Sequence, residues 1–569
     1  MRLTLLAAAR GANRLARPFH VVRAMRIGAP ERLRIAPPDI RTADSTVADE
    51  IYAGYFSFDG KTVSAHGRSP FAVNPPSAAW RRSLAGFSWL RHLRAADKAL
   101  ACENARALVA DFLALRRPAA DDPAFEPAVT ARRTLSFLAQ SPLLLEESES
   151  EFYDSFMESL AQGARVLSRA LGAGEAAGAD RIVCAIALAE FSICADAQRD
   201  TFALAARLLT RELDRQILSD GGHIGRNPRT ISDLLLDLLP LRQVYAARGV
   251  HPPEALLRAI DRMFPMLRLL QHGDGSLALF NGMGATAQDR LATIFAHDRA
   301  PGAIQMNAPY AGYQRLEAGE ALVIADCGAP PPIEYSRFAH AGVLSFEYSL
   351  GFERVVVNCG APRPQYEAAS EAARATAAHS TLTLDNRSSC RIAAGAGSGR
   401  WLGGRVVDGP RIVGVDRRQS KSGLLLELSH DGYARDYRLV HERILALTHD
   451  GSRLIGEDRL VPVKGATHAA AASDFAVRFH LHPRVRPTPV GGGSKIELAL
   501  PSGALLLFEA KGFTPAIEES VFFAAPEGPR KTSQIVVTGR VGAQAKLRWS
   551  FRRVTERQES ETVPPAADV

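Results

Sequence analysis

The feature that most constrains this chain is a change of hydrophobic period about half-way along its sequence. Up to about residue 297 the apolar residues recur at helical spacing, whereas from about Pro309 onward they alternate with polar residues in short runs. No helical segment in the second half is long enough to connect parallel strands. The sequence therefore predicts an all-helical domain followed by antiparallel β-sheets.

The helical half contains about seven amphipathic segments between Trp80 and residue 297, separated by short connectors rich in Gly, Pro or Asp. Such a series is typical of antiparallel helical hairpins stacked into a bundle or a toroid. We expect this domain to span residues 76–308. Residues 1–75, rich in Arg, Pro and Ala, are expected to form an N-terminal arm or docking segment.

The second half reads as many short strands joined by turns of Gly, Pro, Asn and Asp. We expect residues 309–555 to form a stack of antiparallel sheets. The last segment, residues 556–569, is polar and rich in Glu, Pro and Ala, and we predict a disordered tail.

Charge and cysteine content exclude several classes of protein. Lys and Arg exceed Asp and Glu by 69 to 61, but no block of like charges indicates a nucleic-acid-binding tail, and an acidic polysaccharide would suit this balance equally well. The six cysteines are scattered and form no CxxC pair, so reduced thiols are expected. No apolar stretch approaches the length of a membrane span, and the amino terminus lacks a clear secretion signal.

One connector in the helical half carries more polar groups than a turn requires. The stretch SDGGHIGRNPRT, residues 219–230, contains His223, Arg226 and Asn227 among glycines and a proline. Cationic and amide donors of this kind bind a carboxylate and stabilise negative charge on it. The alternative is structural, since Gly and Asn also end one helix and begin the next.

A second group of polar residues lies in the strand half. His340, Asn358, Cys359 and His379 occur in three strand-like pieces whose ends could converge. Two imidazoles with a thiolate or carboxamide are plausible ligands of a zinc ion. The alternative to a metal site is that these four are packed core residues. A further pair, His480 and His482, lies on one face of a predicted strand, and the structural interpretation of that pair is hydrogen-bonded sheet residues.

With these segments in view, the chain resembles the heparinase II/III family of polysaccharide lyases. The resemblance runs from about Trp80 to about Arg540 and rests on the segments SWLRHLRA, RQILSDGGHIGRNP, AHAGVLSFEYSLG, VVVNCG, AAHSTLTLD and SHDGY through VRFHLHP. It implies an (α/α) toroid followed by a β-sandwich, a cell-envelope or periplasmic location, and β-elimination of a uronic-acid-containing glycan. That reaction needs a donor for the uronate carboxylate, a base for the C5 proton and an acid for the leaving oxygen.

Several residues that the family uses are absent from their expected places. The family's Tyr-His pair falls on Thr230 and Ile231, and a threonine cannot replace a phenol as acid and base at neutral pH. The family asparagine should open the helix that here reads AAGADRIVCAIAL.

Two interpretations of function follow, and a third stays open. In a variant lyase, His223, Arg226 and Asn227 would bind the carboxylate, helped by His340, and His379 or His340 would move the proton. Alternatively, the fold is catalytically degenerate and binds or organises an envelope polysaccharide. In the third interpretation, the N-terminal arm docks the chain onto a partner, and the protein is an assembly scaffold. Separately, the lack of a clear secretion signal leaves a cytoplasmic location open.

Overall fold

The computed structural model describes residues 24–96, 98–115, 121–298, 301–302, 304–393, 402–464, 473–541 and 546–554. The chain divides into two compact units. The helical unit comprises Met1–Gly221, Ile231–Phe264 and Asp289–Pro301, and the sheet unit comprises Gly222–Thr230, Pro265–Gln288 and Gly302–Val569. The predicted tail 556–569 and the first part of the predicted arm lie outside the described residues.

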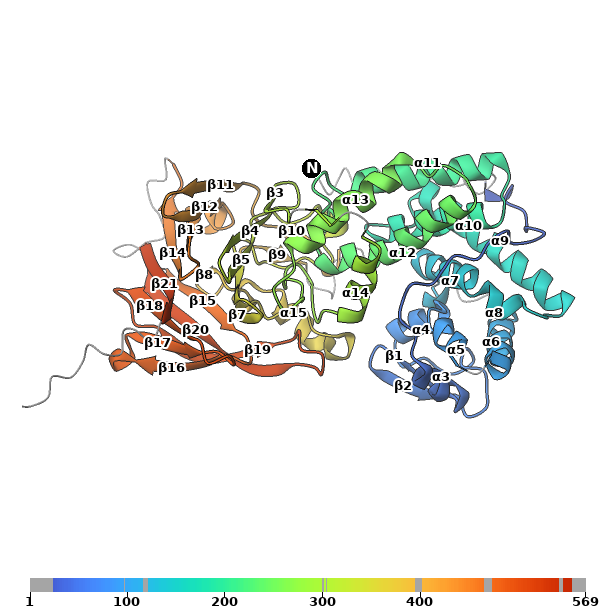
Figure 1. Cartoon of the computed structure of the whole chain (residues 1–569), viewed down its shortest axis with the longest axis horizontal. Coiled ribbons are helices and arrows are strands. Elements are labelled where there is room, and N and C mark those ends of the chain that lie inside the picture. Colours follow the sequence, from blue (N-terminus) through green and yellow to red (C-terminus); the bar gives the residue numbers. More distant parts are fainter. Residues whose placement is uncertain are drawn as a thin grey trace, which may run out of the picture. The chain divides into compact units, whose positions relative to one another are not determined.

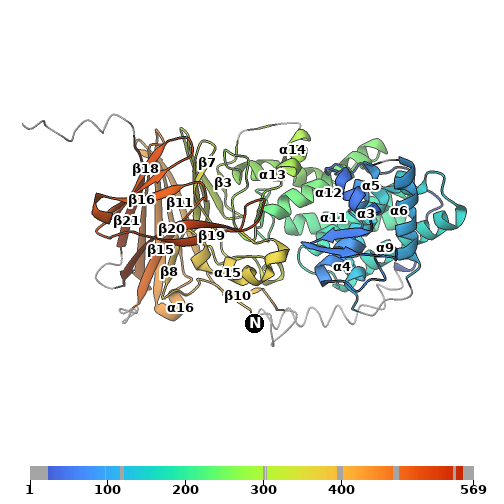
Figure 2. The same ribbon diagram turned by 90° about the horizontal axis from the view of Figure 1, so that it is seen from below.

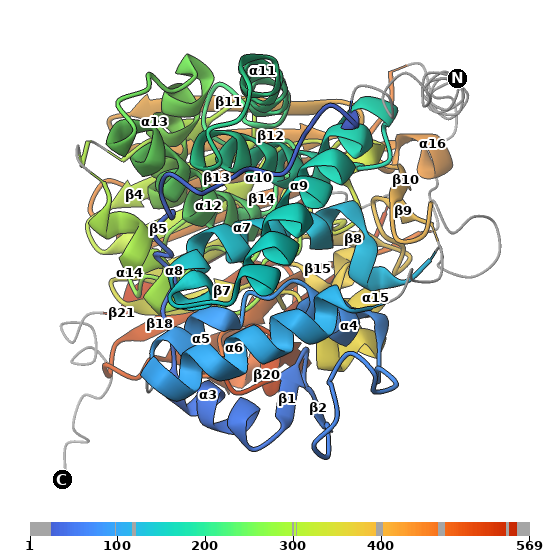
Figure 3. The same cartoon turned by 90° about the vertical axis from the view of Figure 1, so that its right-hand side faces the viewer.

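The predicted order, helices first and antiparallel sheets second, is confirmed (Figure 1). In the helical unit, α10 is the central helix, because almost every residue of DRIVCAIALAEFSIC is buried. It packs against α7, α9 and α11 (Figure 3). The helices are α3 (Ser45–Tyr52), α4 (Ala78–Ala85), α5 (Leu90–Arg94), α6 (Lys98–Leu113), α7 (Pro127–Ala139), α8 (Ser141–Leu145), α9 (Ser150–Ala173), α10 (Asp180–Cys194), α11 (Arg199–Gln216), α12 (Pro228–Ala247), α13 (Glu254–Leu269) and α14 (Gln288–Ala296).

The region predicted as a separate arm belongs to the helical unit in its described part. It contains α3 and a hairpin of β1 (Tyr55–Phe58) and β2 (Lys61–Ser64). The Arg34 amide donates to the carbonyl of Cys194 at 2.8 Å, and the Arg41 side chain pairs with Asp237. These bonds attach the segment to α10 and α12, so residues 24–75 are part of this unit's packing.

The sheet unit is built around two antiparallel sheets (Figure 2). One has the strand order β19-β20-β15-β7-β6-β5-β4-β3, with β8 paired to β15 at its side, and the other has the order β11-β12-β13-β14-β21-β18-β17-β16. The first contains β3 (Asn307–Ala308), β4 (Tyr313–Ala318), β5 (Ala321–Asp326), β6 (Phe346–Leu350), β7 (Glu353–Val357), β8 (Leu382–Leu384), β15 (Asp474–Leu481), β19 (Ala516–Phe522) and β20 (Arg530–Arg540). The second contains β11 (Val413–Ser420), β12 (Gly423–His430), β13 (Leu439–Thr448), β14 (Arg453–Pro462), β16 (Arg486–Val490), β17 (Lys495–Ala499), β18 (Leu505–Lys511) and β21 (Lys546–Val554).

One apolar core lies between the two sheets. Phe346 of β6 stacks on Trp549 of β21 with ring centroids 5.5 Å apart, and Phe479 of β15 meets Phe508 of β18 at 5.1 Å. Burial alternates strictly along β13, as a strand with one core-facing side requires. The predicted β-sandwich is therefore present.

The boundary between the units is less simple than the predicted division at residue 309. Segments 222–230 and 265–288 precede that position but cluster with the sheets. The reason is polar bonding, because both segments place side chains that hydrogen-bond to groups of the sheet unit, as described next. None of the described helices combines the length and apolar character needed to cross a lipid bilayer.

Candidate functional site

The loop before α12 is fastened to the sheet unit by Arg226. Its guanidinium donates from Nε to the carbonyl of Ala311 at 2.7 Å and from the terminal nitrogens to the carbonyls of Gly328 at 2.8 Å and Gly312 at 3.1 Å. It also forms an ion pair with Asp326 at the end of β5. Only 6% of Arg226 is exposed, so its donors are used inside the protein.

The electrostatics of this pair keep the guanidinium charged. Burial by itself lowers the pKa of Arg226, but the facing Asp326 carboxylate outweighs that effect and holds the pKa above its ordinary value. Gly328 permits the close approach, because a Cβ there would come within 2.5 Å of the guanidinium carbon. The backbone of Arg226 has φ 60, a left-handed conformation that non-glycine residues seldom adopt.

The two other polar residues of the loop also have structural contacts. His223 is 2% exposed, and its Nδ1 accepts a hydrogen bond from the Gly225 amide at 2.9 Å. Burial lowers the pKa of His223 to about 4, so the imidazole is neutral at neutral pH. The Asn227 side chain accepts from the Arg229 amide at 2.9 Å and caps the first turn of α12.

The two sandwich histidines form a buried pair. His340 Nδ1 and His379 Nε2 are 3.0 Å apart, and His379 Nδ1 lies 2.8 Å from the carbonyl of Ala375. The carbonyl can only accept, so His379 carries its proton on Nδ1 and its Nε2 accepts from His340. Burial lowers the pKa of His379 to about 4 and that of His340 well below its ordinary value, which leaves both rings neutral.

One polar network connects this pair to the loop. The His340 amide donates to Asn281 Oδ1 at 3.3 Å, and Asn281 Nδ2 donates to Asp326 at 3.1 Å and to the Tyr313 hydroxyl at 3.0 Å. Tyr313 in turn donates to the carbonyl of Arg226. The structure thus brings Arg226 and His340 into one network of the sheet unit, through residues for which no role was predicted from the sequence.

The four residues considered as zinc ligands do not converge. Asn358 and Cys359 are adjacent at the end of β7 and have different partners: Asn358 Oδ1 accepts from the Ser380 amide at 2.9 Å, while Cys359 Sγ lies 3.5 Å from His480 Nδ1. Across the described ranges, no three His, Cys, Asp or Glu side chains are placed to hold a metal ion. Two imidazoles bonded to each other would leave zinc short of its usual four ligands, so the geometry lends the zinc prediction no support.

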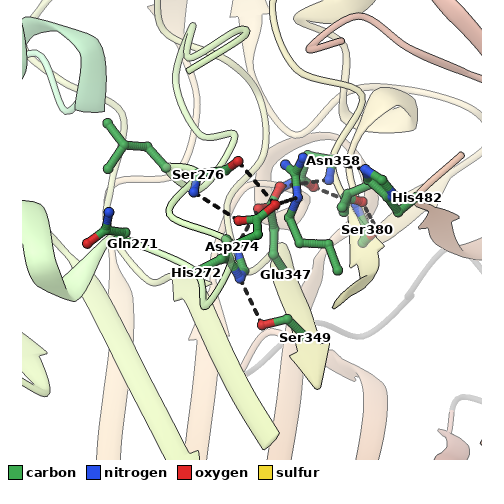
Figure 4. Close-up of polar contacts among 12 residues, drawn as sticks. Gln271, His272, Asp274, Ser276, Glu347, Ser349, Asn358, Ser380 and His482 are labelled. Carbon is green, nitrogen blue, oxygen red and sulfur yellow. Dashed lines mark hydrogen bonds and ion pairs between the residues drawn. The ribbon is translucent and has the colours of Figure 1, made fainter. Parts of the chain in front are cut away.

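A second buried cluster surrounds Glu347, whose side chain lies in the position of a core residue of β6 (Figure 4). His272 is hydrogen-bonded through both ring nitrogens. Its Nε2 lies 2.9 Å from Glu347 Oε2, and its Nδ1 lies 3.0 Å from the Ser349 hydroxyl. The other oxygen of Glu347 accepts from the Asn358 amide at 2.9 Å. This cluster attaches segment 265–288 to the sheet, as Arg226 attaches the loop.

Next to this cluster a pocket of about 290 Å³ opens in the sheet unit. Arg354 and His482 contribute to its wall, together with Asp274, which pairs with Arg354 at 3.1 Å. Burial lowers the pKa of His482 to about 3. Of the predicted pair of sheet histidines, His482 therefore lines a pocket, whereas His480 is buried and bonded to Ser520 at 2.7 Å.

Comparison with known proteins agrees with this architecture. Residues 300–550 match the family described as heparinase II/III-like, C-terminal. FtsZ-localized protein C of Caulobacter vibrioides (strain NA1000 / CB15N) is 32% identical over 545 residues, which cover 92% of this chain and 91% of that protein.

The chain belongs to the heparinase II/III-like family.

Solved structures of the family share the fold at low sequence identity. Heparinase III superposes with a TM-score of 0.71 at 13% identity, covering 95% of this chain and 89% of the other. A mutant of the heparan sulfate lyase HepC from Pedobacter heparinus gives a TM-score of 0.64 at 14% identity, covering 96% and 88%. These matches establish the arrangement of helices and sheets, and the activity of those proteins is not carried over by them.

The positions at which heparinase II/III proteins were expected to carry catalytic residues hold other groups here. Thr230 and Ile231 form the first turn of α12, and Ile231 is 2% exposed. At the start of α10, where an asparagine was expected, Arg181 makes a buried ion pair with Glu212 at 2.8 Å. The catalytic roles predicted for His223, Arg226, Asn227 and His379 stay predictions.

The residues that organise this site were largely missed from the sequence. No role is predicted from the sequence for Asp326, Asn281, Tyr313, Glu347 or His272. One signal was available, since Glu347 lies between Phe346 and Tyr348 in a wholly buried strand. A charge there needs a buried partner.

Proposed function

We propose that this protein is a non-catalytic member of the heparinase II/III-like family that works by association with FtsZ in the assembly of the cell envelope. The similarity to FtsZ-localized protein C supports this, because it covers 92% of this chain and 91% of that protein at 32% identity. The matches to lyases are as long but stand at 13% and 14% identity. We further propose that it occupies the compartment that holds FtsZ.

The observation that carries the proposal is the burial of the predicted catalytic groups. His223, Arg226, Asn227, His340 and His379 are between 1% and 9% exposed. Each makes hydrogen bonds to other residues of the sheet unit. A general acid or base must reach the proton that it transfers, directly or through one water, and a carboxylate clamp must have donors left over. These side chains support the structure of the loop and sheets more readily than they support β-elimination.

Co-sedimentation with FtsZ tests the association directly. Purified full-length protein is mixed with FtsZ of its own organism under conditions in which FtsZ is polymeric or monomeric. We expect the protein to sediment only with polymer, and heparinase III, which shares the fold, to stay in the supernatant. Failure to sediment with polymer at any concentration that saturates FtsZ would contradict the proposal.

A variant lyase is the second candidate, favoured by the fold match to heparinase III over 95% of this chain. It predicts that incubation with heparan sulfate, alginate or another uronate-containing glycan produces the ultraviolet absorbance of an unsaturated uronate. In that case His379→Ala should abolish the signal while the protein stays folded. The proposed function predicts no such absorbance with any acidic glycan, and no metal requirement for binding FtsZ.

A further inference from the structure

A second pocket lies entirely within the helical unit. It has a volume of about 240 Å³ and is bounded by the segment around Arg41, by helices α7, α10, α12 and α14, and by the chain that leads into α5. This volume is below the roughly 300 Å³ at which pockets for drug-sized ligands begin. The pocket suits a small molecule or one functional group of a larger one.

Glu190 of α10 lines this pocket and is 3% exposed. Within the part of the chain that the structure describes, its carboxyl group has no hydrogen-bond partner. Burial raises the pKa of Glu190 well above the ordinary value, and the nearby Asp237 and Asp39 carboxylates add to the effect, while Arg41 and Arg132 oppose it. This shift favours the protonated carboxylic acid, whose O–H can donate a hydrogen bond.

Within the described residues, Arg91 is the guanidinium of this pocket that forms no ion pair with a carboxylate. It donates from Nε to the carbonyl of Thr42 at 3.1 Å and from one terminal nitrogen to the carbonyl of Ser88 at 2.6 Å. Burial lowers the pKa of Arg91, the Asp39 and Asp289 carboxylates oppose that effect, and the neighbouring cations Arg41 and Arg290 add to it. A partly buried cation with like charges close by is stabilised by an anion.

Two further arginines have donors to spare. Arg132 gives one terminal nitrogen to Asp237 at 2.7 Å, and Arg290 approaches Asp233 only to 3.4 Å. With Glu190 neutral, the guanidinium groups lining the pocket outnumber its carboxylates by four to three: Arg41, Arg91, Arg132 and Arg290 against Asp39, Asp233 and Asp237. The lining is thus rich in donors, and with Glu190 protonated its net charge is positive.

We propose that this pocket binds the oxyanion group of a small molecule, a carboxylate or a tetrahedral sulfate or phosphate group. Arg91 and Arg132 pair with the anion, and the carboxylic acid of Glu190 donates to it from the pocket wall. Hydrogen bonds between charged partners are short and strong, and planar guanidinium groups match both kinds of oxyanion. The site involves none of the residues predicted to be catalytic.

Titration calorimetry of the full-length protein with sulfate and with acetate, at constant ionic strength set by chloride, tests the proposal. We expect saturable binding of at least one of them, and the stronger of the two identifies the kind of oxyanion. Arg91→Ala should weaken binding about tenfold or more, Arg91→Lys should weaken it less, and Arg211→Ala on the exposed face of α11 should leave it unchanged. Absence of binding beyond the chloride control would overturn the proposal. It would also be overturned if folded Arg91→Lys and Arg132→Ala variants both bound the anion as strongly as the wild type does.

The role of Glu190 is tested by the pH dependence of anion binding. The probe is sulfate if it binds and acetate otherwise, because the charge of neither anion changes between mildly acidic and mildly alkaline pH. Ionisation of Glu190 would remove a donor and add a negative charge, so wild-type binding should weaken as pH rises. Glu190→Gln keeps a neutral donor of the same shape and should bind with little pH dependence. An identical pH profile for the two proteins would remove Glu190 from the site.

Discussion

Arg226→Ala separates a structural role for the loop from a catalytic one. In the structure the side chain makes hydrogen bonds to four backbone carbonyls, of Ala311, Gly312, Gly328 and Ala329, besides its ion pair with Asp326. Removing one partner of a buried ion pair typically costs about 3–5 kcal/mol, because the other charge stays buried. The loss is a large fraction of the roughly 5–15 kcal/mol by which domains are stable.

We therefore expect Arg226→Ala to lower the free energy of unfolding of the sheet unit by about 4 kcal/mol. Hydrogen exchange of peptides from β5 and β6, measured by mass spectrometry, reports this unit specifically. Arg226→Gly should recover no more than about 1 kcal/mol, the ordinary cost of a left-handed residue. Replacing both partners, by Arg226→Met with Asp326→Leu, should recover a substantial part, because no buried charge is then left unpaired.

Arg435→Ala is the matched control, because Arg435 pairs with Asp408 at 2.5 Å while 72% of its side chain is exposed. It should change stability by less than about 1 kcal/mol. If Arg226→Ala has as small an effect as Arg435→Ala, the loop does not depend on its guanidinium. The structural reasoning would then be refuted, and a ligand-binding role for Arg226 would gain weight.

Three other perturbations follow from buried ionisable groups. Asp458→Asn should destabilise the sheet unit by about 3 kcal/mol at neutral pH, because Arg443, fully buried, makes a bidentate pair with this carboxylate. The pKa of Asp458 is held below its usual range, so the urea midpoint of the wild type should fall as pH drops below about 4. The difference in stability between the two proteins should shrink over the same range. His223 and His379 have pKa values lowered to about 4 by burial, so between about pH 6.5 and pH 4 the unfolded chain binds more protons than the folded chain. Thermal melts should therefore show stability falling as the pH is lowered over this range. Equal melting temperatures across the range would contradict the burial of these rings. Glu190 holds its proton more tightly when folded, which lowers stability as pH rises above about 4, so Glu190→Gln should stabilise the protein more under alkaline than under acidic conditions, and a pH-independent gain would argue against its raised pKa.

Most of the architecture could be predicted because hydrophobic period reports burial directly. In β13 the residues Leu439, Leu445 and Leu447 share a parity and all face the core. Charged residues are few in α10, which is the central helix of its unit. The breaks within the helical half were not visible in this way. The helical-period stretch from residue 83 to residue 115 divides among α4, α5 and α6, and Phe87 adopts a left-handed conformation with φ 56 shortly after α4.

The candidate site was harder to predict, because donors that bind a substrate and donors that fasten a loop look the same in a sequence. Arg226 was recognised as unusual, yet only the structure shows that its partners are carbonyls of the same unit. The partners lie about 85 to 102 residues away along the chain, at Ala311 and Gly328. A useful sign was a charged residue with the parity of core residues, as for Arg443 in β13, since such a residue requires a buried partner of opposite charge.

The two readings of the fold make opposite demands on the same network. Elimination at a uronate needs donors and an imidazole that a polymeric substrate can reach. In the network around Asp326, these groups are hydrogen-bonded to other residues of the protein, and Asp326 itself is 2% exposed. If the network serves the fold alone, Arg226→Ala should reduce the proposed association with FtsZ only as far as it unfolds the protein. Below the melting temperature of the variant, co-sedimentation should then match the wild type. If the network serves catalysis, activity should disappear at temperatures at which the variant is still folded, and this difference in temperature dependence distinguishes the two without knowledge of the glycan.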